Sequence, residues 1–525
     1  MNEPASGKAT ATAAGVENAM DGQKKLFWAC FVALVATSFA FILRIMIMGD
    51  LAQEFNLSET QKGEIQGVGI WPFAISIVLF SLTIDRIGFG KAILFAFFAH
   101  SIFALMTIFA VGYWTLYIAS FIGGLAAGAI EAAINPLVAT IFRKDKTKWL
   151  NILHAGWPAG LVLAGVLAIT LGDTGLLSGL TDGGLGWKGK IALIFIPVLM
   201  YGLMMSTCKF PVSERVAAGV SYQAMLKVVG FLGALITTTL ILLEVGRVFA
   251  FPDALTWGLV LLLSLAYGVK VRAIGRPLFI LLMLVMIPLA ITELGTDSWI
   301  TALMEPEMAS LGLHPLWVLI YTASLMMVLR FLAGPIVHKL SPLGLLAVSS
   351  ALAICGLFFL SRAGGMVILG AATIYGLGKT FFWPTMLGVV SEQFPRGGAL
   401  TLNLMGGIGM LAAGVLGNPL LGNIQDREVT RRLQAEHPAI HDGLVAETKL
   451  SIFGRYKPID GARLEESEEG VKATVAAVRD EAKKGALRTV LIFPGIMLVA
   501  YLGMLLYFRS KGGYRPVLLN VNDPG

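Results

Sequence analysis

The chain has 525 residues, of which 14% are charged and 56% are hydrophobic, and its formal net charge is +7. A soluble protein carries about 25% charged residues, and a globule of this composition would expose a continuous apolar surface. The composition therefore excludes a soluble globule, a disordered chain and a coiled coil, and it indicates a membrane protein.

Apolar runs long enough to cross about 30 Å of hydrocarbon as helices follow one another along most of the chain. Residues 1–23 precede them as a small, polar segment without the apolar core of a signal peptide, and we expect a cytoplasmic tail there. We predict about fourteen spans, near 26–48, 64–84, 91–112, 114–142, 149–171, 190–208, 224–246, 254–270, 277–299, 315–337, 343–361, 366–390, 398–421 and 487–508. The run at 254–270 is short, and a re-entrant segment is the alternative there.

Lys and Arg gather in alternate loops between these runs. Clusters occur at Arg143–Lys148 and Lys270–Arg276, whereas the intervening loops hold acids such as Asp50 and Asp253. This is the positive-inside pattern of inner-membrane proteins. It predicts a multi-pass protein of the cytoplasmic (inner) membrane with both termini in the cytoplasm. Topology then accounts for the positive charge, and no nucleic-acid partner is needed.

A charge-rich segment at 423–486 interrupts the pattern. We expect a soluble insert on the outer face, with a helix from Arg463 to Lys484. A plain cap is the simpler interpretation, and a ligand-binding domain is the alternative. The predicted division is a tail at 1–23, a six-helix half at 24–210, a linker with two extra helices at 211–276, five helices of a second half at 277–422, the insert at 423–486, and the last span and tail at 487–525.

Three short stretches recur about 250 positions apart, which indicates an internal duplication. The stretch Gly128–Pro136 corresponds to Gly376–Pro384, and Leu150–Gly156 corresponds to the stretch from Leu402. The end of the first span, from Arg44, corresponds to the stretch from Glu293. The duplication predicts two six-helix halves with two extra helices between them, a layout typical of transporters built from parallel repeats.

The stretch from Ser81 to Lys91 (SLTIDRIGFGK) resembles the loop signature G-x-x-x-D-R-x-G-x-x-K of the major facilitator superfamily, with Ser81 in place of the first Gly. The resemblance implies an all-α major facilitator fold. It also implies that Asp85, Arg86 and Gly88 act in the conformational switch between the halves. The alternative is an ordinary basic turn at the membrane interface.

Two further stretches resemble the fucose–proton symporter family. They are Glu131–Pro136, which matches E-x-A-x-N-P, and Trp383–Thr385, which matches an aromatic-Pro-Thr motif. The resemblance implies that Glu131 takes part in proton coupling and sugar binding. Three positions depart from that family, because its helix-one Asp falls at Ile45, a Gln at His154 and its helix-five Asn at Trp157. These departures weigh against fucose itself.

Four ionisable residues stand out inside predicted spans, where a charge costs at least about 2.5–3.5 kcal/mol on insertion scales. Arg44, Glu131, Glu293 and Lys379 are therefore the strongest candidates for substrate or proton binding. The alternatives are fixed ion pairs between helices and, for Arg44, a side chain that reaches the outer interface. The weaker candidates for the same role are polar or aromatic residues of the spans, namely Asn135, His154, Trp157, Trp383 and Asn403.

Their alternatives are hydrogen bonds between helices for the asparagines, a satisfied core histidine, and interfacial anchoring for the tryptophans. Arg330, near the end of its span, is assigned to the switch, with a cavity contact as the alternative. Glu244 and Arg247 lie three positions apart in the first extra helix and form a local pair in our interpretation.

No phosphate-binding loop, catalytic cluster or metal-ligand spacing is present, and the three cysteines lie far apart. We therefore expect no enzyme, cofactor or metal. The function predicted is secondary active transport of a small polar solute, foremost a sugar, by alternating access and coupled to protons, by a monomer in the lipid bilayer. The alternatives are an exporter of organic anions or drug-like solutes, with Arg44 and Lys379 as anion contacts, and a transporter-like sensor that reads a ligand through its insert.

Overall fold

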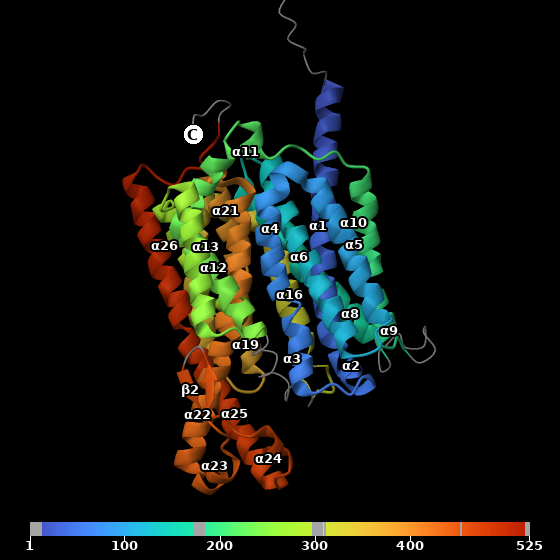
Figure 1. Ribbon diagram of the computed structural model, residues 1–525, viewed down its shortest axis with the longest axis vertical. Helices are drawn as coiled ribbons and strands as arrows, with labels where there is room; N and C mark the ends of the chain where they lie inside the picture. Colours follow the sequence, from blue (N-terminus) through green and yellow to red (C-terminus); the bar gives the residue numbers. More distant parts are fainter. Residues whose placement is uncertain are drawn as a thin grey trace, which may run out of the picture.

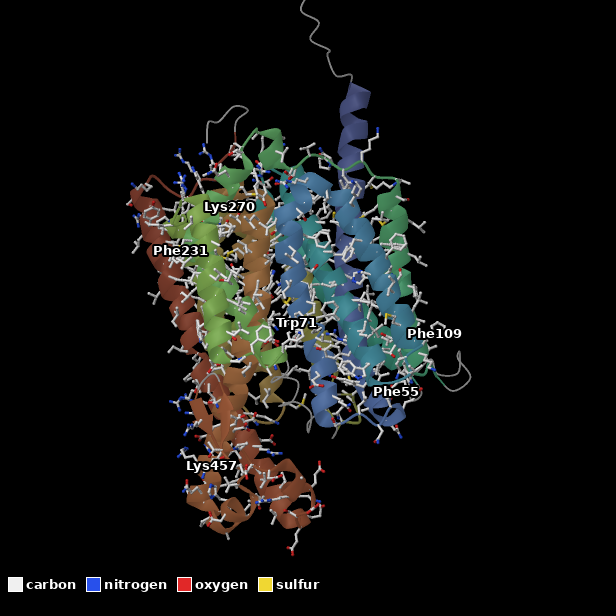
Figure 2. All side chains as sticks on the ribbon, in the orientation of Figure 1. Phe55, Trp71, Phe109, Phe231, Lys270 and Lys457 are labelled. Carbon is white, nitrogen blue, oxygen red and sulfur yellow. The ribbon has the colours of Figure 1, made fainter. Side chains whose placement is uncertain are left out.

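The protein folds as a bundle of helices that run side by side, with a smaller unit projecting from one end (Figure 1). A computed structural model describes residues 13–172, 184–296, 308, 311–314, 316–451 and 454–519. Both ends of the described chain lie at one end of the bundle, which also carries Lys270 (Figure 2). We call this the basic end and the opposite one, from which the insert projects, the insert end.

The first half of the bundle contains ten helices among the described residues. They are α1 (Ala13–Met46), α2 (Met48–Glu54), α3 (Glu59–Gly67), α4 (Trp71–Ile87), α5 (Phe89–Ile108), α6 (Tyr113–Ile141), α7 (Lys146–His154), α8 (Gly156–Thr170), α9 (Trp187–Ala192) and α10 (Phe195–Ser206). The expected tail is partly helical, because α1 begins at Ala13; residues 1–12 lie outside the described part.

The linker and the second half follow. The linker holds α11 (Glu214–Ala217), α12 (Tyr222–Val248) and α13 (Asp253–Val271). The second half holds α14 (Pro277–Leu294), α16 (Leu316–Phe331), α17 (Ala333–Leu340), α18 (Pro342–Leu360), α19 (Val367–Lys379), α20 (Phe382–Gln393), the 3-10 turn η2 (Pro395–Gly397), α21 (Gly398–Leu411), the π-helical η3 (Ala412–Gly417) and α26 (Ile492–Ser510).

Within the described residues, twelve helices are long and apolar enough to cross a membrane, and α16 with α17, bent by 64°, makes a thirteenth. The remaining predicted span, 366–390, is divided between α19 and α20, and each of these helices is too short to cross a membrane alone. The alternative for 254–270 is wrong, because α13 is a continuous helix of 19 residues packed along α12. The end of the predicted span at 277–299 lies partly outside the described residues.

The bundle has an apolar interior, and it also turns many large apolar side chains outward. Phe109, at the rim of the bundle in Figure 2, is 73% exposed, and Leu203, Val269 and Val499 are exposed to a similar degree. A soluble protein does not present such a surface, whereas hydrocarbon covers it without cost. The two halves meet where α4 packs against α21, α8 against α16 and α7 against α20.

The insert forms a small unit with its own apolar core. Its elements are α22 (Asn418–Glu436), α23 (Pro438–Leu444), the antiparallel strands β1 (Lys449–Ser451) and β2 (Gly454–Tyr456), α24 (Gly461–Glu465) and α25 (Glu469–Val490). Leu433 of α22 and Val475 of α25 are buried at the centre of this unit. The two helices connect it directly to the bundle, α22 through η3 and α25 through α26.

The helix predicted from Arg463 to Lys484 is wrong at its start, because the chain breaks between α24 and α25. Asp460 caps α24 by accepting hydrogen bonds from the amides of Ala462 and Arg463. Four acids in this stretch would repel one another inside a single helix. With the break, Glu469 lies in the first turn of α25, where the helix dipole favours a negative charge.

Candidate functional site

A hydrogen-bonded chain of buried polar groups starts at Glu131 in α6. Its Oε2 accepts a hydrogen bond from Asn135 Nδ2 at 2.9 Å, and Asn135 Oδ1 lies 3.0 Å from Nε2 of His154. The three side chains are buried, and α7 ends at His154. Among the described residues Glu131 forms no ion pair, so the pairing with Lys379 or Arg44 considered as its alternative is not observed. The carboxyl group of Glu131 therefore has an amide, and no cation, as its hydrogen-bond partner among the described residues.

Arg330 connects the two halves at His154, where the chain of polar groups from Glu131 ends. Its Nη1 donates to the carbonyl of His154 in the first half at 2.8 Å. In the second half, Nε donates to the carbonyl of Thr380 at 2.8 Å, and Nη2 pairs with Glu293 Oε1 at 2.9 Å. Arg330 is 2% exposed, so it lies inside the protein and not at the membrane interface, because α16 ends and bends just after it.

Glu293 is the ionic partner of Arg330, as its alternative interpretation allowed. Its second oxygen, Oε2, accepts a hydrogen bond from the backbone amide of Trp383 at 3.0 Å. The Trp383 ring packs over Gly409, where a Cβ would lie 2.5 Å from the ring. Lys379 is buried one turn earlier, with Nζ 5.7 Å from the centre of the Tyr375 ring.

Prolines supply the backbone acceptors of this network. A proline has no N–H, so the carbonyl four residues earlier has no helical partner. Pro158 leaves the carbonyl of His154 free in this way, and Pro384 leaves that of Thr380 free; Arg330 binds both. Pro136 frees the carbonyl of Ala132, which accepts a hydrogen bond from Asn403 Nδ2 of the other half at 2.9 Å. The alternative given for Asn403, a hydrogen bond between helices, is thus observed.

Arg44 lies apart from this network, in a narrow cavity lined mostly by helices of the first half. We call it the inner cavity. The guanidinium lies against Gly69, where a Cβ would come 1.4 Å from Nη1, and 5.8 Å from the centre of the Phe41 ring. Its Nε has no hydrogen-bond partner, and no described residue forms an ion pair with Arg44. Trp157 lines the same cavity.

His100 also faces the inner cavity and was not identified from the sequence. Its Nδ1 lies 3.3 Å from the hydroxyl of Tyr201, and its Nε2 has no partner. In the sequence, His100 is a lone histidine within the predicted span 91–112, and its position there is the feature that could have identified it. The inner cavity therefore contains a cation and an unpartnered imidazole nitrogen, both facing apolar walls.

The loop signature lies at the basic end and binds the linker. Asp85 accepts hydrogen bonds from Ser213 Oγ at 2.6 Å and from Arg215 Nη2 at 2.6 Å. Arg86 lies over the ring of Tyr222 at 5.2 Å, and Gly88 joins α4 to α5 with φ at +83°, a conformation that favours glycine. Asp85 thus holds α11 in place, which is consistent with the expected part of the signature in switching.

Two more side chains at the basic end tie the halves together and were missed in the sequence. Lys146 of α7 pairs with Glu214 of α11 at 2.6 Å and donates to the carbonyl of Ser391 in α20 at 3.1 Å. Glu392 accepts hydrogen bonds from the amide and hydroxyl of Thr147 at 3.1 and 2.5 Å. Lys146 belongs to the basic cluster Arg143–Lys148 that indicates topology, and Glu392 was not singled out, because no local pattern distinguishes either residue.

The last described residues also bind Glu392. The hydroxyl of Tyr514 donates to Glu392 Oε2 at 2.7 Å, and the amide of Val517 donates to its carbonyl at 2.8 Å. Burial, with the negative charge of Glu392, raises the pKa of Tyr514 well above its usual value, so the hydroxyl remains a donor. One carboxylate therefore holds both the first half and the C-terminal segment.

A membrane-spanning bundle of two halves, with buried charges where the halves meet, defines a solute transporter. The chain belongs to the Major Facilitator Superfamily, whose sequence profile matches residues 28–417. The predicted fold class and the assignment to transporters in place of enzymes are confirmed.

Two curated relatives match parts of the chain. The gentisate transporter of Corynebacterium glutamicum is 26% identical over 173 residues, 33% of this chain and 37% of that protein. The cis,cis-muconate transport protein of Acinetobacter baylyi is 26% identical over 182 residues, 34% of this chain and 42% of that protein. The chain thus aligns with less than half the length of these relatives.

Among solved structures, the superfamily transporter FucP in its outward conformation is similar. The match covers 91% of this chain and 99% of that chain, with 14% identity and a TM-score of 0.55. At this identity the likeness concerns the fold alone.

Proposed function

We propose that this protein is a secondary transporter of small organic acids, coupled to protons through Glu131. The observation that carries the proposal is Arg44, a guanidinium buried in a cavity without an anionic partner among the described residues. An uncompensated buried charge is costly, and an anionic solute would neutralise it. Arginine suits this task because its donors match the two oxygens of a carboxylate.

The names of the two relatives support an acid as the solute. Gentisate and muconate are both carboxylates, and each relative is named for transporting one of them. The sugar expected from the resemblance to fucose symporters is the alternative, but a neutral solute leaves Arg44 without a counter-charge. The aromatic residues Phe41 and Trp157 beside Arg44 provide an apolar wall for the remainder of an acid.

Proton coupling rests on the position of Glu131 next to the contact between the halves. The chain from Glu131 through Asn135 ends at His154, whose carbonyl binds Arg330. Protonation of Glu131 changes the charge beside this contact, which the halves must break to move apart. We propose a monomer in the cytoplasmic membrane, with the basic end facing the cytoplasm.

The test is uptake by proteoliposomes containing the purified protein. The solutes are labelled gentisate, benzoate, muconate, fucose and xylose, each with and without an inward proton gradient. We expect accumulation of at least one acid that depends on the gradient, and a loss of about tenfold or more in Arg44→Gln.

Arg362→Gln is the matched control, because Arg362 also lies over a phenylalanine ring, Phe358, but is exposed. It should leave uptake unchanged. Uptake of a sugar without any acid, or full acid uptake by Arg44→Gln, would contradict the proposal.

A further inference from the structure

A second cavity lies beside the inner one, where the first extra helix meets the bundle. We call it the side cavity. Trp71 of α4 forms part of its wall and lies toward α12 in Figure 2. The ring of Trp71 also makes an edge contact with Phe249, just after α12, at 6.3 Å. The opposite wall comes from the end of α21 and from the π-helical η3.

Two residues, Ile70 and Met410, line both cavities. Ile70 lies in the break between α3 and α4, and Met410 lies in the last turn of α21, two residues before η3. Methionine is unbranched and adapts its shape readily, and π-helical turns recur at functional sites. The side and inner cavities therefore adjoin at these two apolar side chains, one of which is flexible.

The side cavity has its own charged group, contributed entirely by α12. Arg247 donates from Nε and Nη2 to the two oxygens of Glu244, at 3.0 and 2.6 Å. The Glu244 side chain is 8% exposed and that of Arg247 62%, so the arginine is at the mouth of the cavity. Arginine has five N–H donors, and Glu244 occupies two of them. A carboxylate can bind the remaining donors of Arg247 or compete with Glu244 for the others.

We propose that the side cavity is an entry site for the transported acid, in which Arg247 binds the carboxylate and Trp71 contacts the apolar part before the acid passes to Arg44. The inference rests on the proposed function, because the class of ligand is taken from the inner cavity. It gives the extra helix α12 a part in substrate binding that a bundle of two six-helix halves lacks. The local Glu244–Arg247 pair then has a function beyond holding a helix turn.

The first test compares Arg247→Gln with Arg431→Gln in the uptake assay. Arg431 is a close geometric match: it pairs with Glu428 three positions earlier, at 2.9 and 2.7 Å, and its side chain is 66% exposed, but it lies on the insert. We expect Arg247→Gln to raise KM for the acid about tenfold with kcat within about twofold, since an entry site determines capture. Arg431→Gln should match the wild type. An unchanged KM in Arg247→Gln would overturn the proposal.

The second test blocks the side cavity chemically and does not depend on the ion pair. Gly414→Cys places a thiol there in a variant whose Cys30, Cys208 and Cys355 are replaced by serine. The new Cβ meets Ile70 Cγ2 at 3.5 Å, an ordinary contact, so the fold should persist. We expect a sulfonated methanethiosulfonate reagent to abolish acid uptake and the acid to slow the labelling. Uptake that survives complete labelling, without protection by the acid, would refute the entry site.

The cysteine-free parent separates the two proposals. If the parent accumulates acid and the fully labelled Gly414→Cys variant does so too, only the entry site is refuted. A parent and wild type that both accumulate no acid refute the proposed function and this inference with it.

Discussion

Arg330 shows how much one buried side chain can connect. It binds Glu293 in α14, the carbonyl of Thr380 at the start of the α19–α20 break, and the carbonyl of His154 in the other half. Removing one partner of such a buried pair typically costs about 3–5 kcal/mol, because the other charge is left uncompensated. The pair is therefore either intact or replaced in a different arrangement of the halves, which suits a residue of the switch.

Some residues of the site could be predicted from the sequence, whereas most of their contacts could not. Arg44, Glu131, Glu293 and Lys379 were found because a charge inside a long apolar run is conspicuous. Arg330 was assigned to the switch from its place near the end of a span, but the sequence does not show the bend after Phe331 that accompanies its burial. The partners in the other half could not be predicted, since pairs such as Asn403 and the carbonyl of Ala132 are 271 positions apart.

Glu131 carries the first prediction. Glu131→Gln keeps an oxygen for the hydrogen bond from Asn135 but cannot gain or lose a proton. We expect accumulation driven by a proton gradient to fall to the background level, while exchange of internal for external acid stays within a few-fold of the wild type. Counterflow and gradient-driven uptake, measured in the same proteoliposomes, give the two values.

Glu131→Asp is the control for Glu131→Gln, because it shortens the side chain but retains the carboxyl group. It should recover part of the gradient-driven uptake. Undiminished accumulation in Glu131→Gln would show that Glu131 does not carry the coupled proton.

At the scale of elements, the spans were predictable and their interruptions were not. Length and hydropathy locate apolar helices because the bilayer sets both. The breaks between α7 and α8 and between α19 and α20 depend on what the freed carbonyls bind, which is a tertiary property. The proline positions alone mark which carbonyls are free, and this rule could have been applied to the sequence.

Pro158 carries the second prediction. Pro158→Ala restores an N–H that can bond to the carbonyl of His154 within the helix, in competition with Arg330 Nη1. We expect the transport rate to fall several-fold, because the contact between the halves is weakened, while the thermal unfolding temperature of the purified protein is unchanged or higher. Transport and unfolding are measured on the same preparation.

Pro197→Ala serves for comparison, since Pro197 lies in the first turn of α10 and its freed carbonyl, that of Leu193, binds neither Arg330 nor Asn403. Its transport should equal that of the wild type. If both variants transport equally, the carbonyl of His154 has no part in the cycle.

At the scale of the whole molecule, a group of polar contacts joins the halves at the basic end. Lys146 and Thr147 of α7 reach the end of α20, and α11 lies between the loop signature and Lys146. The duplication predicted two halves of this kind, and the family match confirms the fold. The contacts themselves, 245 positions apart for Thr147 and Glu392, come from the folded arrangement alone.

Glu392 carries the third prediction, because it holds the first half through Thr147 and the C-terminal segment through Tyr514. Glu392→Ala removes both attachments and should favour the state that is open at the basic end. We expect the Thr147 amide to exchange its hydrogen for deuterium at least about tenfold faster, since it loses its acceptor and hydrogen bonds to charged groups contribute about 1.5–3 kcal/mol. Glu469→Ala, an exposed acid of the insert paired with Lys472, should leave that exchange unchanged. Equal exchange in wild type and Glu392→Ala would show that the halves are held closed by the ion pairs of α11 instead.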